Sequence, residues 1–184
     1  GDFVEKRNNY GRYILALKDQ NLFLMGDGFN EDGQFPFLDQ FSIETKKTKR
    51  LYESTYKYKK ETLRDFMPDE DKILVRIESP SDYPNYYFRS LKGKELSQVT
   101  YFSNPFKSLQ NVYKKLIKYN REDGLDLSAT LYLPEGYDMD KKEKLPMIMW
   151  AYPREFKDKS SASQTTQNPN EFTYPYWGSP IYWL

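Results

Sequence analysis

Hydrophobic and polar residues alternate cleanly over one stretch of the chain, residues 125 to 133, with the sequence LDLSATLYL. A period of two predicts a β-strand with one buried face and one wet face. The next run, 145 to 152, is apolar at nearly every position, and such a run predicts a strand that is covered on both faces. A half-exposed strand followed by a buried one is typical of the start of an α/β layer. We therefore expect the polar loop after Tyr152 to lie at the edge where open α/β sheets bind their ligands.

The first hundred residues predict short strands joined as hairpins. Two apolar runs within 13–25 flank Lys18, Asp19 and Gln20, which predicts a hairpin with largely buried strands. No helical period occurs before residue 103, so this part predicts an all-β meander, either a sandwich or propeller blades. The further predicted strands are 38–44, 48–54, 62–67, 72–78 (with Ile73, Val75 and Ile77 on one face), 86–91 and 95–102.

The spacing of these hairpins favours propeller blades over a sandwich. A blade of four strands takes about 40 to 50 residues, and a hairpin, a loop and a second hairpin occur near 10–55 and again near 60–102. Two blades cannot close a ring. The expected fold class is therefore mainly β, with propeller blades followed by the first strands of an α/β layer.

A change in organisation follows at Asn104. Asn104 and Pro105 are a good helix start, with a capping side chain and a proline at the first helical position. We expect a short helix to about Asn111. The predicted division is a propeller part at 1–103, a linker at 104–118 and the start of a truncated α/β domain at 119–184.

Composition removes several classes of function. The formal charge is +1, from 28 basic and 27 acidic residues, so no overall field would attract nucleic acid. The chain has no cysteine and no histidine, which excludes a Ser-His-Asp triad and histidine or cysteine metal sites built from this chain alone. No run approaches the roughly 18 apolar residues of a membrane span, so we expect a soluble protein without membrane insertion. If a parent protein is exported, for example to the periplasm, its signal lies outside these residues.

Three charged clusters are best interpreted as structural. Lysines alternate with Tyr56 and Tyr58 up to Lys60, which predicts a strand with one wet face rather than a nucleic-acid stripe. The acidic turn 69–71 lacks the spaced ligands of a calcium loop. The loop 27–33 uses its glycines for positive φ and lacks the context of a phosphate loop. We expect no metal and no cofactor.

Several segments of the chain resemble a known family. The segments REDGLDLSATLYLPEGYD, LPMIMWAYPREFKDK and NPNEF resemble the entry into the catalytic domain of prolyl oligopeptidase family serine peptidases, most closely the glutamyl endopeptidase branch. YILALKDQNLFLMGDG, PFLDQF and ESPSDYPNYYFRSL resemble the last propeller blades of the same proteins. The resemblance covers nearly the whole chain, and it is most specific from 120 to 156.

This resemblance implies a parent protein with a propeller and an α/β-hydrolase domain that cleaves peptides after Glu or Asp. It implies that this chain holds the last β-propeller blades followed by the first strands of the α/β-hydrolase peptidase domain. Such enzymes carry their serine on a G-x-S-x-G elbow, followed by Asp and His. This sequence has neither that elbow nor a histidine. We expect the triad to lie beyond residue 184, the rest of the parent peptidase to be the chain's partner, and the separate chain to be inactive and to associate with itself through unpaired strand edges.

Two candidate site residues follow from the resemblance. Relatives use a tyrosine hydroxyl at the end of the third sheet strand to stabilise the oxyanion, and Tyr152 matches that place. Pro153, Arg154 and Glu155 stand where many relatives have small glycine-rich residues, a departure that agrees with the glutamyl branch. Arg154, with Lys157, is a candidate for attracting an acidic substrate side chain, although basic surface residues are usually only solvated.

An alternative interpretation involves no catalysis. The chain could be an autonomous all-β module that binds peptide or glycan through its many tyrosines. A reading frame that continues to G-x-S-x-G and then Asp and His favours the peptidase, whereas a natural stop after Leu184 favours the module.

Overall fold

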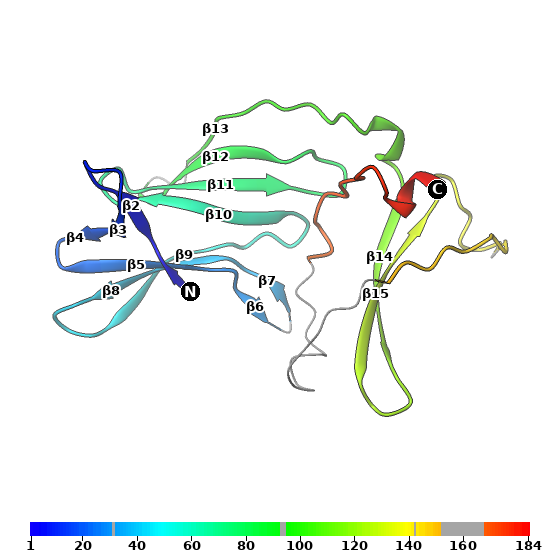
Figure 1. Ribbon diagram of the computed structural model, residues 1–184, viewed down its shortest axis with the longest axis horizontal. Coiled ribbons are helices and arrows are strands. Elements are labelled where there is room, and N and C mark those ends of the chain that lie inside the picture. Colours follow the sequence, from blue (N-terminus) through cyan, green and yellow to red (C-terminus); the bar gives the residue numbers. More distant parts are fainter. Residues whose placement is uncertain (31, 93–94, 142, 152–167) are drawn as a thin grey trace. The chain divides into compact units, whose positions relative to one another are not determined.

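The computed structural model describes residues 1–30, 32–92, 95–141, 143–151 and 168–184 (Figure 1). The fold is mainly β, as predicted, and the two helical elements of the described part are the 3₁₀ turns η1 (Lys107–Leu109) and η2 (Pro180–Trp183). Two compact units are present. The first contains Gly1–Ser103 together with Asn170–Phe172, and the second contains Asn104–Pro169 and Thr173–Leu184.

The first unit is built from two antiparallel sheets, one after the other along the chain (Figure 1). The first sheet has the order β1-β5-β8-β9, and β4 also pairs with β5. The second sheet has the order β10-β11-β12-β13, so each strand pairs with the next in sequence. The bounds are β1 (Asp2–Phe3), β4 (Leu17–Lys18), β5 (Asn21–Gly26), β8 (Phe37–Ser42), β9 (Thr48–Glu53), β10 (Lys60–Met67), β11 (Lys72–Glu78), β12 (Asn85–Ser90) and β13 (Leu96–Gln98), with two small ribbons of β2 (Glu5–Arg7) with β3 (Tyr13–Leu15) and β6 (Phe29–Asn30) with β7 (Gly33–Gln34).

Turn chemistry fixes the register of these strands. Lys18 pairs with Asn21 across a two-residue loop, and both loop residues, Asp19 and Gln20, have positive φ (49° and 59°). That is the twist required to join two tightly paired antiparallel strands. Bulges then bend the longer strands, one in β10 between Leu63 and Asp65 and one where β8 meets β9.

The core of the first unit is a single cluster contributed by both sheets. Phe23 from the first sheet and Phe66 from the second meet edge to face, with ring centroids 4.9 Å apart. The predicted alternation in β11 is confirmed, because Ile73, Val75 and Ile77 are all buried. The buried members of the cluster are Val4, Ala16, Phe23, Leu38, Phe66, Ile73, Val75 and Ile77.

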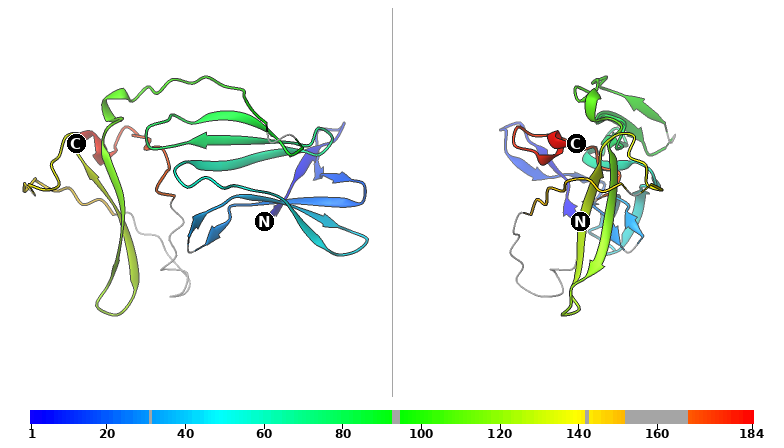
Figure 2. Two further views of the ribbon diagram at one scale, coloured as in Figure 1. Left: turned by 180° about the vertical axis from the view of Figure 1, so that it is seen from behind. Right: turned by 90° about the vertical axis from the view of Figure 1, so that its right-hand side faces the viewer.

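The second unit contains one long hairpin, β14 (Tyr113–Asn120) with β15 (Asp126–Leu133), which Figures 1 and 2 show as a two-stranded ribbon. The strand predicted from alternation at 125–133 is therefore present. Gly124, with φ of 79°, closes the turn, and Arg121 pairs there with Asp123 at 2.6 Å. β14 begins inside the stretch predicted as a linker, 104–118, and the propeller, linker and hydrolase division stays a prediction.

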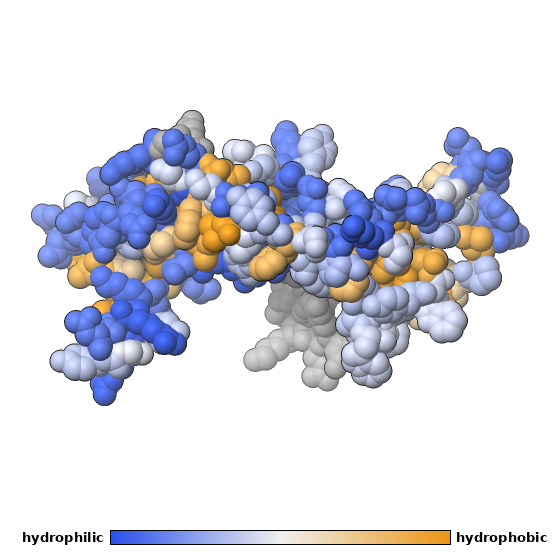
Figure 3. All heavy atoms as spheres, turned by 90° about the horizontal axis from the view of Figure 1, so that it is seen from above, coloured by the Kyte–Doolittle hydropathy of each residue, from blue (hydrophilic) through white to orange (hydrophobic). Residues whose placement is uncertain are grey.

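The prediction of a buried strand at 145–152 is wrong for the described residues 145–151. They form no strand, and Met147, Met149 and Trp150 are 78%, 80% and 62% exposed. The physical reason is that a strand needs neighbours to satisfy its backbone, and no strand of the described chain pairs with this run. Figure 3 shows one face of the molecule, on which hydrophobic residues lie among hydrophilic ones.

Smaller differences from the predictions have local causes. The expected helix at 104–111 is only the 3₁₀ turn η1, and Asn104 instead accepts a hydrogen bond from the backbone N–H of Phe106. The Lys-Tyr alternation at 56–59 is a bend and not a strand. The strands predicted to be largely buried within 13–25 are partly open, with Tyr13 62% exposed. No helix in the described part of the chain has the length and hydrophobicity to cross a bilayer.

Replacement of Leu38 tests the shared core. Leu38 is fully buried, so Leu38→Ala should lower the free energy of unfolding by about 2–5 kcal/mol through lost burial and a residual cavity. Urea unfolding followed by circular dichroism measures it. The matched control is Leu96→Ala in β13, where the leucine is 39% exposed and the change should be less than about 1 kcal/mol. Equal losses for the two variants would contradict this core.

Candidate functional site

The two predicted site residues, Tyr152 and Arg154, lie outside the described residues, as does Lys157. The last described residue before them is Ala151. The geometry available for a site is therefore that of the buried and clustered polar groups of the first unit.

One buried polar cluster is centred on Glu61, at the start of β10, whose residue is 2% exposed. Arg89 of β12 donates from Nη2 and Nε to Glu61 Oε1 at 2.7 and 3.1 Å. The Tyr52 hydroxyl of β9 donates to Glu61 Oε2 at 2.5 Å. The Arg89 guanidinium also lies against the rings of Tyr52 and Tyr56, 5.1 and 5.8 Å from their centroids. Three strands from both sheets thus meet at one carboxylate.

Electrostatics make this cluster a structural element and not a reactive one. Burial raises the pKa of the Tyr52 phenol, and the adjacent Glu61 carboxylate raises it further. Burial opposes the charge on Arg89, but Glu61 outweighs that effect and the pKa of Arg89 is raised. Both carboxylate oxygens of Glu61 already accept hydrogen bonds, so the group is not placed to act as a general base.

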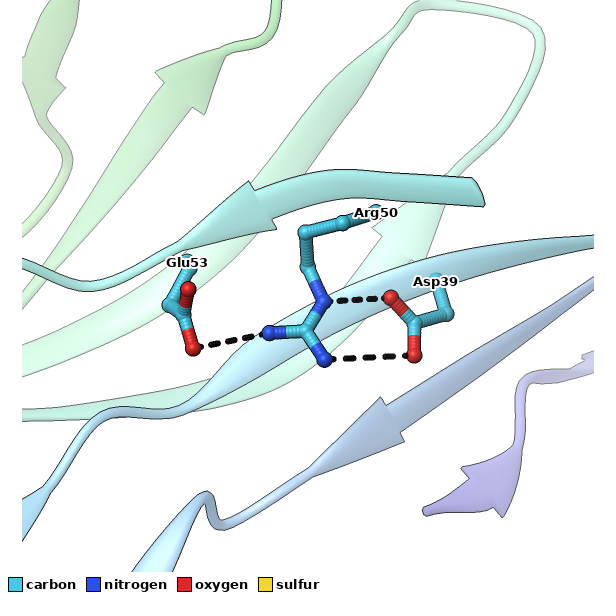
Figure 4. Close-up of polar contacts among 3 residues, drawn as sticks. All are labelled: Asp39, Arg50 and Glu53. Atoms are coloured by element: carbon cyan, nitrogen blue, oxygen red, sulfur yellow. Dashed lines mark hydrogen bonds and ion pairs between the residues drawn. The ribbon is translucent and has the colours of Figure 1, made fainter. Parts of the chain in front are cut away.

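A second charged group surrounds Arg50 of β9 (Figure 4). Arg50 binds Asp39 of β8 at 2.5 Å and Glu53 of its own strand at 2.8 Å, and it stacks 4.0 Å from the centroid of Phe37. The hydrogen bond to Asp39 is the main reason that the pKa of Arg50 is raised, against the opposing effect of burial. The charge of Arg50 is therefore matched by two carboxylates of the protein.

Arg50 also borders a hollow of about 460 Å³ in the first unit. Lys18 and Lys92 lie on its rim, and both pair with Asp71, at 3.9 and 2.5 Å. The hydrogen bond from Lys92 is the largest cause of the lowered pKa of Asp71. Lys18, Lys92 and Arg50 thus neutralise protein carboxylates at this hollow, and its lining has no group with the geometry of a nucleophile and its base.

The other sequence clusters also have structural roles. Lys59 pairs with Asp82 at 3.1 Å. Gly28 has φ of 63°, and a Cβ there would lie 1.8 Å from the carbonyl oxygen of Phe35, so this glycine serves the backbone, as predicted. Among the residues that the structure describes, no cluster of three or more metal-binding side chains occurs.

Sequence reasoning missed the Glu61 cluster, although a signal was present. Glu61 and Leu63 lie two residues apart in β10, so a strand pattern places a carboxylate on the same face as a leucine. A charged residue on an apolar face is rarely buried unless paired. Its partners, Tyr52 and Arg89, could not be identified from spacing alone.

Comparison with known proteins places the chain beside peptidases. It is 37% identical over 198 aligned residues to a probable chloroplastic glutamyl endopeptidase of Oryza sativa subsp. japonica, and 36% identical over 199 to the protein of the same name in Arabidopsis thaliana. Both alignments cover 100% of this chain and 21% of the relative. The chain thus spans about a fifth of the length of these relatives. No protein-family model matches it.

A solved structure of the AtxE2 isopeptidase, a variant with astexin3-dC4 bound, is also similar, with a TM-score of 0.43 and 15% identity. That similarity covers 77% of this chain and 23% of the isopeptidase chain.

The raised pKa of Tyr52 gives a testable pH dependence. Because the folded-state pKa lies above the unfolded value of about 10, the stabilisation is complete below about pH 10 and is lost as the pH rises towards the folded-state value. Tyr52→Phe should therefore lose stability less steeply above pH 10 than the unaltered chain, as measured by urea unfolding midpoints from pH 8 to 11. Tyr58→Phe, at a tyrosine that is 84% exposed, should keep the original slope. Identical slopes for all three proteins would show that folding does not raise the pKa of the Tyr52 phenol.

Proposed function

We propose that this chain is a segment of a serine peptidase of the prolyl oligopeptidase family, in the glutamyl endopeptidase branch. The observation that carries this proposal is the 36–37% identity to probable glutamyl endopeptidases along the whole chain. These relatives are several times longer, since the chain covers 21% of each. The reaction is hydrolysis of peptide bonds, with cleavage after Glu or Asp.

In this proposal residues 1–103 supply the last blades of a propeller, and residues from 119 onward begin the hydrolase domain. The consecutive antiparallel strands β10 to β13 support the first part, because each blade of a propeller is a four-stranded sheet. The identity to probable glutamyl endopeptidases, which extends over the whole of this chain, supports the second.

The chemistry is then divided between this chain and the rest of the parent. A serine oxygen attacks the scissile carbonyl, and negative charge develops on the carbonyl oxygen. The serine and its histidine must come from elsewhere, because this chain has no histidine. Tyr152 would donate its hydroxyl to the developing oxyanion, and Arg154 would attract the acidic side chain of the substrate. The propeller would restrict access by size.

Expression of the 184-residue chain and of a longer protein that contains it tests this division of the chemistry. The 184-residue chain should neither hydrolyse a fluorogenic glutamyl peptide nor react with a serine-directed phosphonate. A longer protein that contains these residues and continues to a G-x-S-x-G elbow should do both, because it adds the nucleophile and its base. Phosphonate labelling of the 184-residue chain would overturn the proposal, and so would a natural stop codon after Leu184, which would favour an autonomous binding module.

Tyr152→Phe in that longer protein tests the oxyanion role. Loss of one preorganised donor should lower kcat by about 10²–10³ with little change in KM. Tyr137→Phe is the control, because its hydroxyl donates to the Glu143 carbonyl and is assigned no catalytic role. A kcat for Tyr152→Phe within threefold of the unaltered enzyme would remove Tyr152 from the proposed site.

A further inference from the structure

Three consecutive residues from near the end of the chain belong to the first unit. Asn170–Phe172 are grouped with Gly1–Ser103, whereas the residues on both sides of them, to Pro169 and from Thr173, are grouped with the second unit. Each of the three residues makes a contact with a different group of the first unit. This tripeptide is therefore held by its own contacts there and not by continuation of a neighbouring strand.

The centre of the contact is Glu78, at the end of β11, whose side chain has no exposed surface. Arg76 binds Glu78 Oε1 at 2.5 Å, and the backbone N–H of Phe172 donates to Glu78 Oε2 at 3.2 Å. A buried carboxylate is costly unless its oxygens are satisfied. The tripeptide thus supplies one of the donors that make burial of Glu78 tolerable.

Side chains on the tripeptide extend this contact in both directions. The Phe172 ring is 5% exposed and meets the ring of Tyr83 edge to face, with centroids 5.2 Å apart. The Glu171 carboxylate pairs at 2.8 Å with Lys60, whose side chain is 15% exposed. The Asn170 side-chain amide donates to the backbone carbonyl of Lys57 at 3.0 Å. The amide of Asn170, the carboxylate of Glu171 and the ring of Phe172 thus each contact a separate partner in the first unit.

We propose that these four groups, the Lys57 carbonyl and the side chains of Lys60, Glu78 and Tyr83, form a docking socket that recognises Asn-Glu-Phe as a linear peptide motif. Its occupant is Asn170–Phe172 of this chain. The acid is selected by Lys60, and the aromatic ring by Tyr83 and by the buried position beside Glu78. Recognition rests on the motif, so the socket also binds it when it is supplied as a separate peptide.

Covalent attachment explains why the socket is filled. A tethered segment presents its motif at an effective concentration of about millimolar, so modest contacts are enough to keep the socket occupied. A free peptide competes poorly until the chain's own motif is removed. None of these contacts depends on peptidase activity. A failure of the proposed function would therefore leave the docking socket unaffected, and a failure of the docking socket would leave the proposed function unaffected.

The test uses the full 184-residue chain, labelled with ¹⁵N, in which Asn170, Glu171 and Phe172 are all replaced by Gly. Titration with the capped hexapeptide of residues 168–173 should give saturable shifts of the Lys60, Glu78 and Tyr83 amide signals. The unaltered chain should bind the peptide at least about tenfold more weakly, because its own motif competes. No saturable shift in the glycine variant, or equal binding of a peptide with Ala in place of Phe, would overturn the docking socket.

A charge exchange identifies the contact with Lys60. The hexapeptide with Lys in place of Glu should bind the glycine variant at least about tenfold more weakly than the native peptide. Adding Lys60→Glu to the glycine variant should reverse this preference. A merely structural effect of the substitution would weaken both peptides alike and would contradict selection of the acid by Lys60.

Hydrogen exchange gives an independent readout if the glycine variant does not fold. The amide of Phe172 should be protected in the unaltered chain, because it donates to Glu78. Its exchange should be at least about tenfold faster in Lys60→Glu, where like charges face each other. The double variant Lys60→Glu with Glu171→Lys should restore the protection. An unprotected Phe172 amide in the unaltered chain, or no recovery in the double variant, would also overturn the docking socket.

Discussion

The first unit depends on the satisfaction of a carboxylate buried between its two sheets. Glu61 is held by Tyr52 from the first sheet and by Arg89 from its own sheet. Breaking a buried pair of this kind by removing one partner typically destabilises a protein by about 3–5 kcal/mol. The positions of β9, β10 and β12 are therefore constrained together, because a slip of one residue in any of them would turn its polar group away from the carboxylate.

This constraint suits a unit with a small aliphatic core. The buried cluster holds eight residues, two of them phenylalanines, while charged residues make up 30% of the chain. Non-directional burial alone specifies sheet alignment weakly, whereas hydrogen bonds to a fixed carboxylate have one geometry. Glu78 repeats the arrangement at the end of β11, with Arg76 and the Phe172 amide as donors. Hydrogen bonds to Glu61 and Glu78 thus determine how the strands are aligned, which apolar packing alone specifies only weakly.

Local pattern predicted most of the strands and none of the long-range polar contacts. The hairpin β8–β9 and the strands β10, β11 and β15 follow from alternation and turn residues within a short window, whereas β14 begins in a stretch predicted as a linker. The Lys-Tyr alternation at 56–59 failed because Tyr56 turns towards Arg89 while Tyr58 stays exposed, so a period of two arises there without a strand. The candidate residues Tyr152 and Arg154 came from family resemblance alone, and they stay predictions.

The apolar run at 145–151 shows the limit of sequence pattern most clearly. Its composition indicates a strand buried on both faces, yet burial is a property of a sheet and not of one segment. With no pairing strand in the described chain, the run keeps its side chains exposed because a lone extended segment cannot satisfy its backbone groups in an apolar environment. The motif at 170–172 is the opposite case, since its amide, acid and ring find partners about a hundred residues earlier in the chain. Local composition therefore indicates which partners a segment requires for burial, and the rest of the fold determines whether those partners are present.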